Sequence, residues 1–346
     1  MRGDVLLGLT SLSVRAITDA AEWRDALSRF GVYDYCHTYD FHSLSAANGE
    51  GEPVAYLVTD RENRDVLFWP ALRRRIGTTE FHDLTSVYGY GGPLLGDEAH
   101  RQACIAELAE AWAEEGIVSV FSRLHPLFVE ALDGAAHATY LGDVAVLDAR
   151  SSSKKMQTYR GSHRREIERA EKAGVTVRIT RDENDIRAFY AIYRTAMETL
   201  NASKYYFFSL DYFFDLIKSV DFDAFCVLAD FDDGPISAAF FIRTQKILQY
   251  YLSGTLGDMR RLAPSKLIIA KMHALAAGWG VTDIVLGGGV GICEDDLLKF
   301  KLGFGCARRP FHVWKQVVLP EVYERLWRER GRDPSAGWFP LYRRNA

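Results

Sequence analysis

Helix-like and strand-like segments alternate along this chain in two successive rounds, and this order restricts the fold more than any other feature of the sequence. Apolar residues that recur every three to four positions predict helices, whereas short apolar runs rich in β-branched residues predict strands. Each round contains one or more helices, a run of antiparallel strands, a further helix and a closing strand. The two rounds share no repeat of sequence. We therefore expect an α/β protein with mixed sheets in which one architecture occurs twice.

The two rounds divide the chain near its middle. The first round has a helix, two strands, a long helix and a strand, at residues 18–30, 53–60, 65–75, 97–116 and 117–124. The second has three helices, three strands, a helix and a strand, at 162–174, 185–200, 210–220, 224–231, 236–244, 247–255, 265–280 and 283–288. The polar stretch 148–157 separates them and is typical of a linker. We therefore expect domains at residues 1–150 and 151–346.

Composition excludes several classes of protein. A chain of 346 residues is long enough for two domains that each bury a core. Its net charge of -4 is too small to attract nucleic acid over the whole surface, so any such contact needs a local basic patch. Five scattered cysteines lack metal-ligand spacing, so we expect reduced thiols and no metal site. No segment approaches eighteen uninterrupted apolar residues, so we expect a cytoplasmic protein without a transmembrane segment.

The segment Asp295–Gly305, DDLLKFKLGFG, is the most unusual short stretch of the sequence. Phe300 lies between Lys299 and Lys301, and two glycines, Gly303 and Gly305, follow near the end of the segment. A lysine in an apolar segment either extends its ammonium group to water or provides a cation where negative charge must be stabilised. The two acids at its start are typical of a helix N-terminus, and we expect Lys299 to be a surface residue.

Several motifs, in this order and spacing, resemble the FemABX family, the peptidyl-transferring branch of the GNAT superfamily. They are VYGYGGPLL, YYLSGT, APSKLIIAKMHALAAGWG, DIVLGGG, LLKFKLGFG and WFPLYRR. The resemblance covers nearly the whole chain and implies two tandem GNAT-like acyltransferase domains. It also implies transfer of an amino acid from the acceptor end of an aminoacyl-tRNA to an amine. No charged heptad hairpin interrupts the second round, so we expect no coiled-coil arm of the kind that some members carry.

The resemblance implies the nature of both substrates. The donor would be aminoacyl-tRNA, a co-substrate, and no cofactor would be needed. The acceptor would be an amine on a cell-wall precursor, a peptide or a small natural product.

Three residues are candidates for catalysis. The resemblance implies that Phe300 and Lys301 match the essential Phe-Lys pair of the family. Attack of an amine on the tRNA ester forms a tetrahedral oxyanion, which the Lys301 ammonium would stabilise. Phe300 would stack on the terminal adenosine, although an ordinary core position explains it too. Tyr251 lies on an expected strand and is a candidate proton relay, but a half-buried strand tyrosine is an equally good explanation.

A basic segment is the candidate phosphate-binding surface. Residues 154–181 contain nine basic and three acidic side chains, a local charge of about +6. Such a helix is either a solvated charged surface or a binding face for phosphates, and the resemblance favours the second. The candidate residues for contact with tRNA phosphates are Arg160, Arg164, Arg165, Arg169, Arg308 and Arg309.

Two aromatic segments are candidates for binding the acceptor. Lys204, Tyr205 and Tyr206 lie in an expected loop that either packs into the core or lines a pocket. Tyr88 and Tyr90 lie in a glycine-rich stretch that allows close approach of a ligand, although a plain turn explains the glycines equally well.

Two other functions remain open. An acyl-CoA-dependent N-acyltransferase would cradle pyrophosphate with the backbone amides of a glycine-rich loop at a helix N-terminus. The corresponding stretch here, RRLAPSKL, departs from that pattern because Pro264 removes an amide donor. The chain could instead be a non-catalytic adaptor that binds tRNA or phosphorylated ligands. The GGGVG stretch at 287–291 lacks the spacing of a dinucleotide-binding motif.

Overall fold

The computed structural model describes residues 12–96, 101–128, 136–150, 155–329 and 338–343. The chain forms two compact units, Met1–Tyr140 with Phe311–Ala346, and Leu141–Pro310. This division differs from the expected domains at two places. Residues 141–150 belong to the second unit, and the segment from Phe311 onward returns to the first.

The strands of the first unit follow the order β1-β2-β3-β4-β6-β13, and the short β5 pairs with β3. Their bounds are Ser13–Ile17 (β1), Glu52–Thr59 (β2), Asp65–Arg75 (β3), His82–Thr85 (β4), Leu94–Leu95 (β5), Ile117–Arg123 (β6) and Ala307–Val317 (β13). Only β4 and β6 run parallel among these pairs, and the other pairs described are antiparallel.

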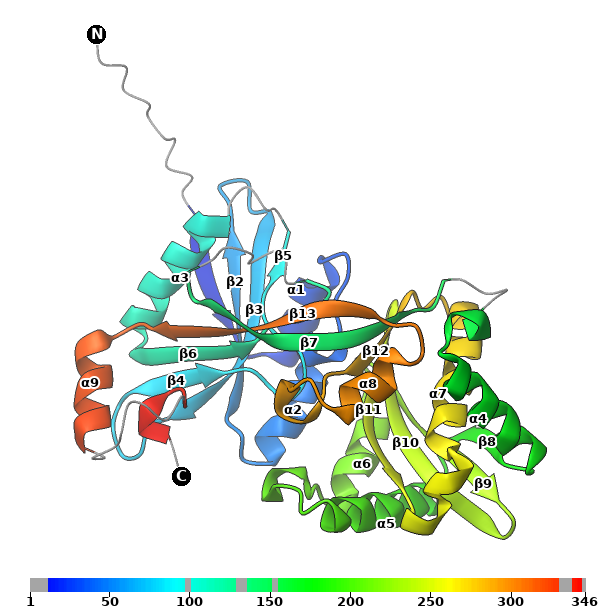
Figure 1. Ribbon diagram of the computed structural model, residues 1–346. Coiled ribbons are helices and arrows are strands. Elements are labelled where there is room, and N and C mark those ends of the chain that lie inside the picture. The colour runs from blue at the N-terminus through cyan, green and yellow to red at the C-terminus, as the bar shows by residue number, and fades with distance from the viewer. Residues whose placement is uncertain (1–11, 97–100, 129–135, 151–154, 330–337, 344–346) are drawn as a thin grey trace. The chain divides into compact units, whose positions relative to one another are not determined.

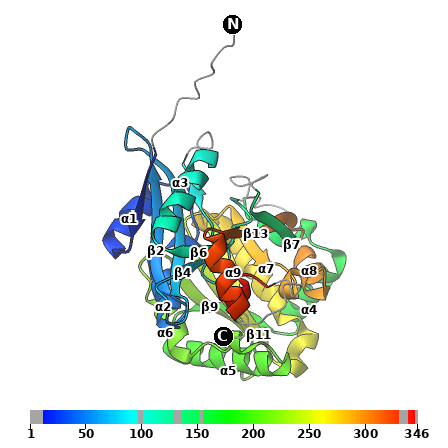
Figure 2. The same cartoon turned by 90° about the vertical axis from the view of Figure 1, so that its left-hand side faces the viewer.

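The helices of the first unit cover both faces of these strands. They are α1 (Ala20–Ser28), α2 (Tyr39–Ala47), α3 (Arg101–Glu114) and α9 (Pro320–Glu329). Side chains alternate across β2, so that Tyr56 packs in the cluster of α3 and Leu57 in the cluster of α1. Accordingly, α1 and α3 lie on opposite sides of the strands (Figure 2). The long apolar runs of β2 and β3 therefore reflect burial on both faces.

The strands of the second unit follow the order β7-β12-β11-β10-β9-β8. Their bounds are Ala138–Asp148 (β7), Thr176–Thr180 (β8), Asp223–Phe231 (β9), Gly234–Thr244 (β10), Ile247–Thr255 (β11) and Asp283–Gly287 (β12). Only β11 and β12 are parallel among the described pairs. The sequence of antiparallel and parallel pairs is thus the same as in the first unit, which confirms the repeated architecture.

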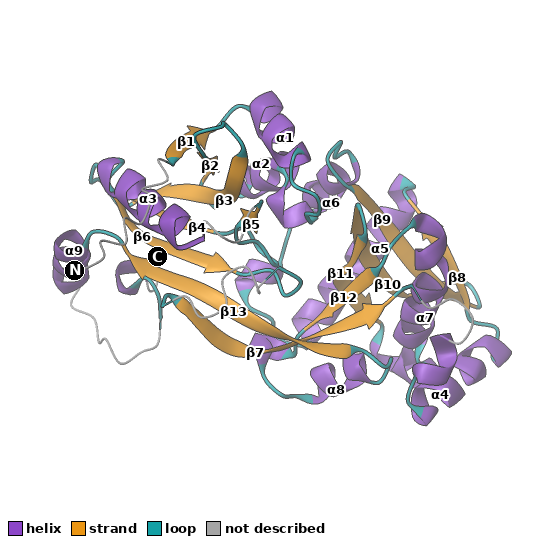
Figure 3. Ribbon diagram, turned by 90° about the horizontal axis from the view of Figure 1, so that it is seen from above, coloured by secondary structure: helices purple, strands orange, loops and turns teal. Residues whose placement is uncertain are grey.

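Helices again cover both faces in the second unit, as Figure 1 and Figure 3 show. They are α4 (Gly161–Lys172), α5 (Glu183–Thr199), α6 (Leu210–Ile217), α7 (Pro264–Ala276) and α8 (Asp296–Leu302). The core beneath α4 and α7 includes Ile167, Met272 and Phe241. On the other face, Phe189 of α5 and Phe213 of α6 pack against Phe240 of β10. The parallel strands β11 and β12 are connected through α7, as a crossover connection requires.

Each unit contains one strand that follows the strands of the other unit in the sequence. After β6 the chain continues into β7, whose residues from Leu141 belong to the second unit. After β12 and α8 it continues into β13, whose residues from Phe311 belong to the first unit and pair with β6. Each unit is therefore completed by a strand that the alternation pattern did not assign to it.

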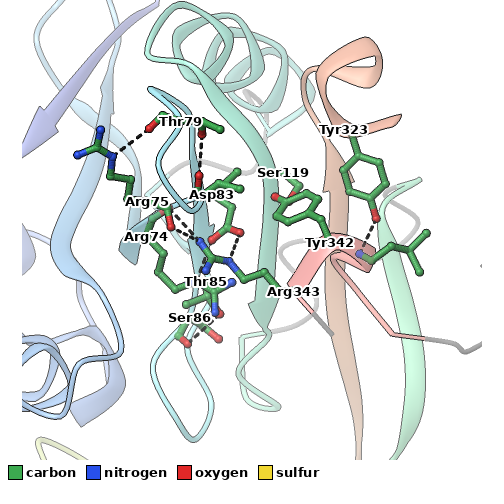
Figure 4. A network of polar contacts seen from close by, with 12 residues as sticks. Arg74, Arg75, Thr79, Asp83, Thr85, Ser86, Ser119, Tyr323, Tyr342 and Arg343 are labelled. Carbon is green, nitrogen blue, oxygen red and sulfur yellow. Dashed lines mark hydrogen bonds and ion pairs between the residues drawn. The ribbon is translucent and has the colours of Figure 1, made fainter. Parts of the chain in front are cut away.

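The C-terminal residues bind to the first unit through a buried carboxylate. Asp83 has no exposed surface and accepts hydrogen bonds from Nε of Arg74 and of Arg343 (Figure 4). Arg343 also donates to the carbonyl oxygens of Arg74 and Arg75, and the buried Tyr342 hydroxyl lies 2.7 Å from that of Ser119. The terminal WFPLYRR motif thus contributes to the core of the first unit through these residues.

The expected α/β class and most expected elements are confirmed, but several elements were missed. The missed strands are β1, β4, β5, β7, β8 and β13, and the missed helices are α2 and α9. In β13 the buried Phe311, Val313 and Trp314 gave only a weak alternation. The longest helix described is α5, with 17 residues, so the described segments contain no coiled-coil arm. Within the described residues, none of the helices has the length and apolar character needed to cross a membrane.

Candidate active site

The two parallel strands of the second unit separate at their carboxyl ends. β11 and β12 pair over three residues only, Ile247–Gln249 with 283–285. Beyond this point Tyr251 forms a bulge, because Leu252 pairs with Phe240 and Tyr250 pairs with the next residue of β10. Diverging carboxyl ends expose backbone groups and side chains that neighbouring strands would otherwise cover, and ligands commonly bind there in α/β proteins.

A glycine-rich turn follows β12 and leads into α8. A Cβ on Gly289 would collide with the carbonyl oxygen of Cys293 and the carboxylate of Asp295, so this position requires glycine. Asp295 caps α8 by accepting from the amide of Leu298 at 2.8 Å, and it also accepts from the amide of Val290 at 2.8 Å. The expected capping role of Asp295 is therefore confirmed.

Lys301 lies on the last turn of α8 and is buried, with 8% of its surface exposed. Its Nζ donates a 2.6 Å hydrogen bond to the carbonyl oxygen of Gly288, one residue beyond the end of β12. Desolvation lowers the pKa of Lys301 from 10.5 to about 8, and the negative charge of Asp295 opposes this shift. At neutral pH the side chain therefore remains mainly protonated. It is a poorly hydrated cation at the carboxyl end of a splayed strand.

Phe300 is partly exposed and packs among three side chains. Its ring centroid lies 5.7 Å from that of His163 and 5.5 Å from that of Phe304, and the Lys266 ammonium lies 5.8 Å from its centre. Lys266 is also paired with Glu166, which lowers the pKa of that carboxyl. One part of the Phe300 side chain thus packs against its neighbours, and the other part is exposed and can contact a ligand.

The two glycines after Lys301 allow close contact with an earlier part of the chain. A Cβ on Gly303 would overlap the His163 ring, and one on Gly305 would lie 2.7 Å from the carbonyl oxygen of Thr158. Gly305 also has φ +76, a conformation that favours glycine. The amide of Arg160 donates to the carbonyl oxygen of Gly303 at 2.7 Å. The glycines therefore let the end of α8 pack against the start of α4.

Tyr251 and the aromatic segment at 204–206 are connected through shared contacts. The hydroxyl of Tyr251 is hydrogen-bonded to that of Tyr212 on α6. Tyr212 stacks on Phe208 with ring centroids 4.4 Å apart, and Phe208 contacts Tyr205 at 5.9 Å. Tyr212 was missed by sequence reasoning, because a tyrosine on an amphipathic helix has no signal beyond burial.

The expected acceptor-binding segment is largely exposed. Lys204 and Tyr205 are exposed, whereas Tyr206 is half-buried and its carbonyl oxygen accepts a 2.6 Å hydrogen bond from the Tyr193 hydroxyl. This segment is a 3-10 turn between α5 and α6 rather than an irregular loop. It therefore combines exposed aromatic surface with a fixed backbone.

The basic residues of α4 form a charged face without acidic partners. Among the described residues, no carboxylate lies within ion-pair distance of Arg160, Arg164, Arg165 or Arg169. Arg164 instead donates to the carbonyl oxygen of Gln157. The helix buries His163, Ile167 and Ala170, whereas Arg165, Glu168, Arg169, Glu171 and Lys172 are exposed.

Arg308 and Arg309 differ from each other in their surroundings. Arg308 is bound by Asp143 at 3.0 Å and by Glu294, so that a phosphate would have to compete with two carboxylates. Arg309 is exposed, and no carboxylate pairs with it in the part of the chain that the structure describes.

Tyr88 and Tyr90 belong to the first unit, whereas the other expected site residues belong to the second. They follow β4, whose parallel pairing with β6 ends at Thr85. The amide of Tyr90 donates to Sγ of the buried Cys36, and its ring contacts Phe311 at 5.4 Å. Gly89, with φ +108, allows this packing because a Cβ would lie 2.8 Å from Sγ of Cys36. No group of three potential metal ligands occurs among the residues described.

Comparisons with known proteins agree with this geometry. A family model for an acetyltransferase (GNAT) domain matches residues 157–295, and no curated protein matches the chain. FemX is a similar solved structure, with a TM-score of 0.70 and 12% identity over 90% of this chain and 99% of that chain. L-PGS from Bacillus licheniformis is similar with a TM-score of 0.57 and 13% identity, over 91% of this chain and 98% of that chain.

A third similar structure is a domain assigned to a lysylphosphatidylglycerol synthetase from Agrobacterium fabrum. It has a TM-score of 0.56 and 14% identity over 86% of this chain and 93% of that chain. Identities this low establish a common fold and no more. The repeated strand order and these likenesses agree: the chain has a fold like that of FemX, and its residues 157–295 match the model of a GNAT domain.

Proposed function

We propose that this protein is an aminoacyltransferase that moves an amino acid from an aminoacyl-tRNA to an amine and forms an amide bond. The observation that carries this proposal is the buried Lys301 ammonium at the carboxyl end of β12. The amine nitrogen attacks the ester carbonyl carbon, and the bond from that carbon to the ribose oxygen then breaks. Lys301 stabilises the oxyanion formed between these two steps, where a preorganised, desolvated cation is most effective.

The aminoacyl-tRNA donor is supported by two features near Lys301. The exposed part of Phe300 offers a surface on which the terminal adenosine can stack, an interaction worth about 1–3 kcal/mol. The unpaired arginines of α4 provide charge for phosphates, and Arg160 contacts the end of α8 directly through its amide. Both features belong to the same unit as Lys301.

The attacking amine must lose a proton during the reaction. The hydroxyl of Tyr251, at the bulge in β11, is hydrogen-bonded to that of Tyr212 on α6. In this proposal Tyr251 takes the proton of the amine and passes its own hydroxyl proton to the departing ribose oxygen, while Tyr212 donates a hydrogen bond that holds the Tyr251 hydroxyl in place.

The acceptor is an amine on a cell-wall precursor, a peptide or a small natural product. Lys204, Tyr205 and Tyr206 bind it in this proposal, because exposed aromatic side chains beside a cation suit a ligand of mixed polarity. Tyr88 and Tyr90 are proposed as further contacts of the acceptor.

The proposal is tested by incubating the protein with a pool of charged tRNAs and candidate amines and measuring which ester is discharged. Lys301→Met is expected to lower the rate about a hundredfold or more. Lys299→Met is the matched control, since Lys299 lies in the same helix but is exposed, and it should retain the rate. Discharge of the ester without any acceptor, or no discharge of any charged tRNA, would refute aminoacyl-tRNA as the donor.

The pH dependence of the rate tests the role of Lys301. If the charged form of Lys301 stabilises the oxyanion, the rate of aminoacyl transfer should fall as the pH rises through about 8, because the ammonium then loses its proton. If the neutral form of Lys301 acts as a general base, the rate should instead rise as the pH passes about 8. The two roles thus predict opposite slopes.

Acyl-CoA-dependent N-acyl transfer is the second function to test. Helix α7 starts without a side-chain cap or an acidic residue in its first turn, which leaves its N-terminus accessible to a phosphate, although Pro264 itself has no amide to donate. Calorimetry with CoA separates this function from the first. Lys301→Met separates both enzymes from an adaptor without catalytic activity, because the adaptor would keep its activity in cells.

A further inference from the structure

Phe300 and Lys301 are held from outside their own helix, by a histidine far away in sequence. His163 of α4 is buried, with 3% of its surface exposed. Its Nε2 lies 2.9 Å from the carbonyl oxygen of Phe300, a distance at which Nε2–H donates. The same carbonyl accepts from the amide of Gly303 at 3.1 Å, so His163 adds a second bond, from outside, to the last turn of a helix of only seven residues.

The same ring makes close packing contacts with the end of α8. It lies edge-on to Phe304 with centroids 4.8 Å apart, and it occupies the space where a side chain at position 303 would be. A helix of two turns has little stability of its own, so its position depends on such tertiary contacts. His163 is therefore placed to determine where the backbone of Phe300 and Lys301 lies.

The second ring nitrogen makes the histidine unlike a satisfied core residue. Nδ1 of His163 is buried and has no hydrogen-bond partner among the described residues. Burial lowers the pKa of His163, so the ring is neutral and its single proton is on Nε2. An unpaired buried acceptor costs free energy of folding.

We propose that His163 is a positioning residue for Lys301. By fixing the Phe300 carbonyl and filling the space beside Gly303, it keeps the last turn of α8 against the turn after β12. This holds the Lys301 ammonium at the Gly288 carbonyl and away from water. The inference rests on the proposed function for its catalytic meaning, but its structural content can be tested without any substrate.

The test reads the protonation of Lys301 directly. In protein labelled with ¹³C,¹⁵N-lysine, NMR follows the titration of each lysine, and Lys301→Met assigns the signal of Lys301. In the unsubstituted protein Lys301 should titrate near pH 8. His163→Ala should admit water and raise that midpoint by about one pH unit or more. His163→Gln, whose amide can donate in place of Nε2–H, should stay near the original value.

The charged groups near both residues define what else could move this midpoint. Asp295 and Cys306 act on Lys301, whereas Arg160, Glu166 and Lys266 act on His163. None of these is changed in the variants.

A second buried histidine provides the matched control. His273 of α7 donates from Nε2 to the carbonyl oxygen of Asp148 and accepts from the Tyr159 hydroxyl. His273→Leu should lower thermal stability but leave the Lys301 midpoint unchanged.

If His163→Ala fails to fold, Gly303→Ala tests the same contact from the other side, because its methyl group displaces the ring.

Each outcome is decisive. An upward shift in His163→Ala or Gly303→Ala, absent in His273→Leu, supports the inference. An unchanged midpoint in folded His163→Ala and Gly303→Ala overturns it. If the shift occurs but no charged tRNA is ever discharged, the positioning role stands and the proposed function fails. If discharge is observed, His163→Ala should lower kcat by about tenfold or more with little change in KM for the charged tRNA.

Discussion

A buried lysine without a carboxylate partner destabilises the fold that contains it. The Nζ of Lys301 bonds to a neutral carbonyl oxygen, and within the described residues no carboxylate lies in ion-pair contact with it. The change of its pKa from 10.5 to about 8 corresponds to about 3 kcal/mol of penalty for the charged form. Groups that are unfavourable for stability are concentrated at functional sites, and this is an argument for a role in chemistry.

This penalty predicts how the stability of the Lys301→Met variant depends on pH. Below pH 8 both the folded and the unfolded protein carry the proton, and the penalty is fully present. Between about pH 8 and 10.5 the unfolded state binds one proton more, so the free energy of unfolding rises with pH. Methionine removes the charge at every pH. The advantage of the variant should therefore shrink by about 3 kcal/mol from pH 7 to 10.5.

Urea denaturation at several pH values measures this change. Lys299→Met, which removes an exposed lysine of the same helix, corrects for the loss of one positive charge. A difference between the two variants that stays constant with pH would mean that Lys301 is hydrated in the folded protein.

At the scale of single elements, the sequence predicts what depends on neighbouring residues. The helical spacing of Ile167 and Ala170 and the acids before Phe300 are local signals, and α4 and the capped start of α8 follow from them. Contacts between distant segments leave no such signal. His163 shares the buried spacing of α4, which predicts burial but not its bond to a residue 137 positions away. The carboxylates that bind Arg308 were hidden for the same reason.

The basic face of α4 predicts a specific salt dependence of tRNA binding. Replacing Arg165 and Arg169 by glutamine removes two guanidinium groups without carboxylate partners. If both bind phosphates, the affinity should fall, and the slope of log K against log salt should become shallower by about 0.7–0.9 for each phosphate that is no longer neutralised. Filter binding or fluorescence anisotropy of charged tRNA over a series of salt concentrations measures this.

Two other arginines of the same region give the matched control for α4. Arg178 is bound by Asp185 and Asp230, and Arg181 by Asp223. Replacing these two by glutamine removes the same charge, but from guanidinium groups that carboxylates already pair. An equal decrease of slope in both double variants would show that net charge, rather than the face of α4, determines binding.

At the scale of the whole chain, the exchange of last strands explains why the expected domain boundary differs from the compact units. Sequence order suggested that everything after residue 150 forms one domain, yet β13 pairs with β6 and the C-terminal residues pack in the first unit. Strand pairing depends on contacts that no local pattern contains, so the order of elements in the sequence does not show which segments complete each unit.

The buried carboxylate in the first unit makes this exchange testable. Asp83 is fully buried and shared between Arg74 and Arg343 (Figure 4). Arg343→Met leaves the carboxylate with one guanidinium and removes the donor to two carbonyl oxygens. Because an incompletely paired buried charge is costly, the first unit should lose about 2–3 kcal/mol of stability.

Hydrogen exchange read by mass spectrometry distinguishes the two units in this Arg343→Met variant. Amides of β3, β4 and β6 should exchange faster, whereas those of β9, β10 and β11 should keep their protection, because they belong to the other compact unit. Arg328→Met is the control, since it breaks only an exposed pair with Glu324 and should cost at most about 0.5 kcal/mol. Faster exchange in both units would mean that they unfold as one cooperative body, and unchanged exchange in the first unit would mean that Arg74 alone is enough to stabilise Asp83.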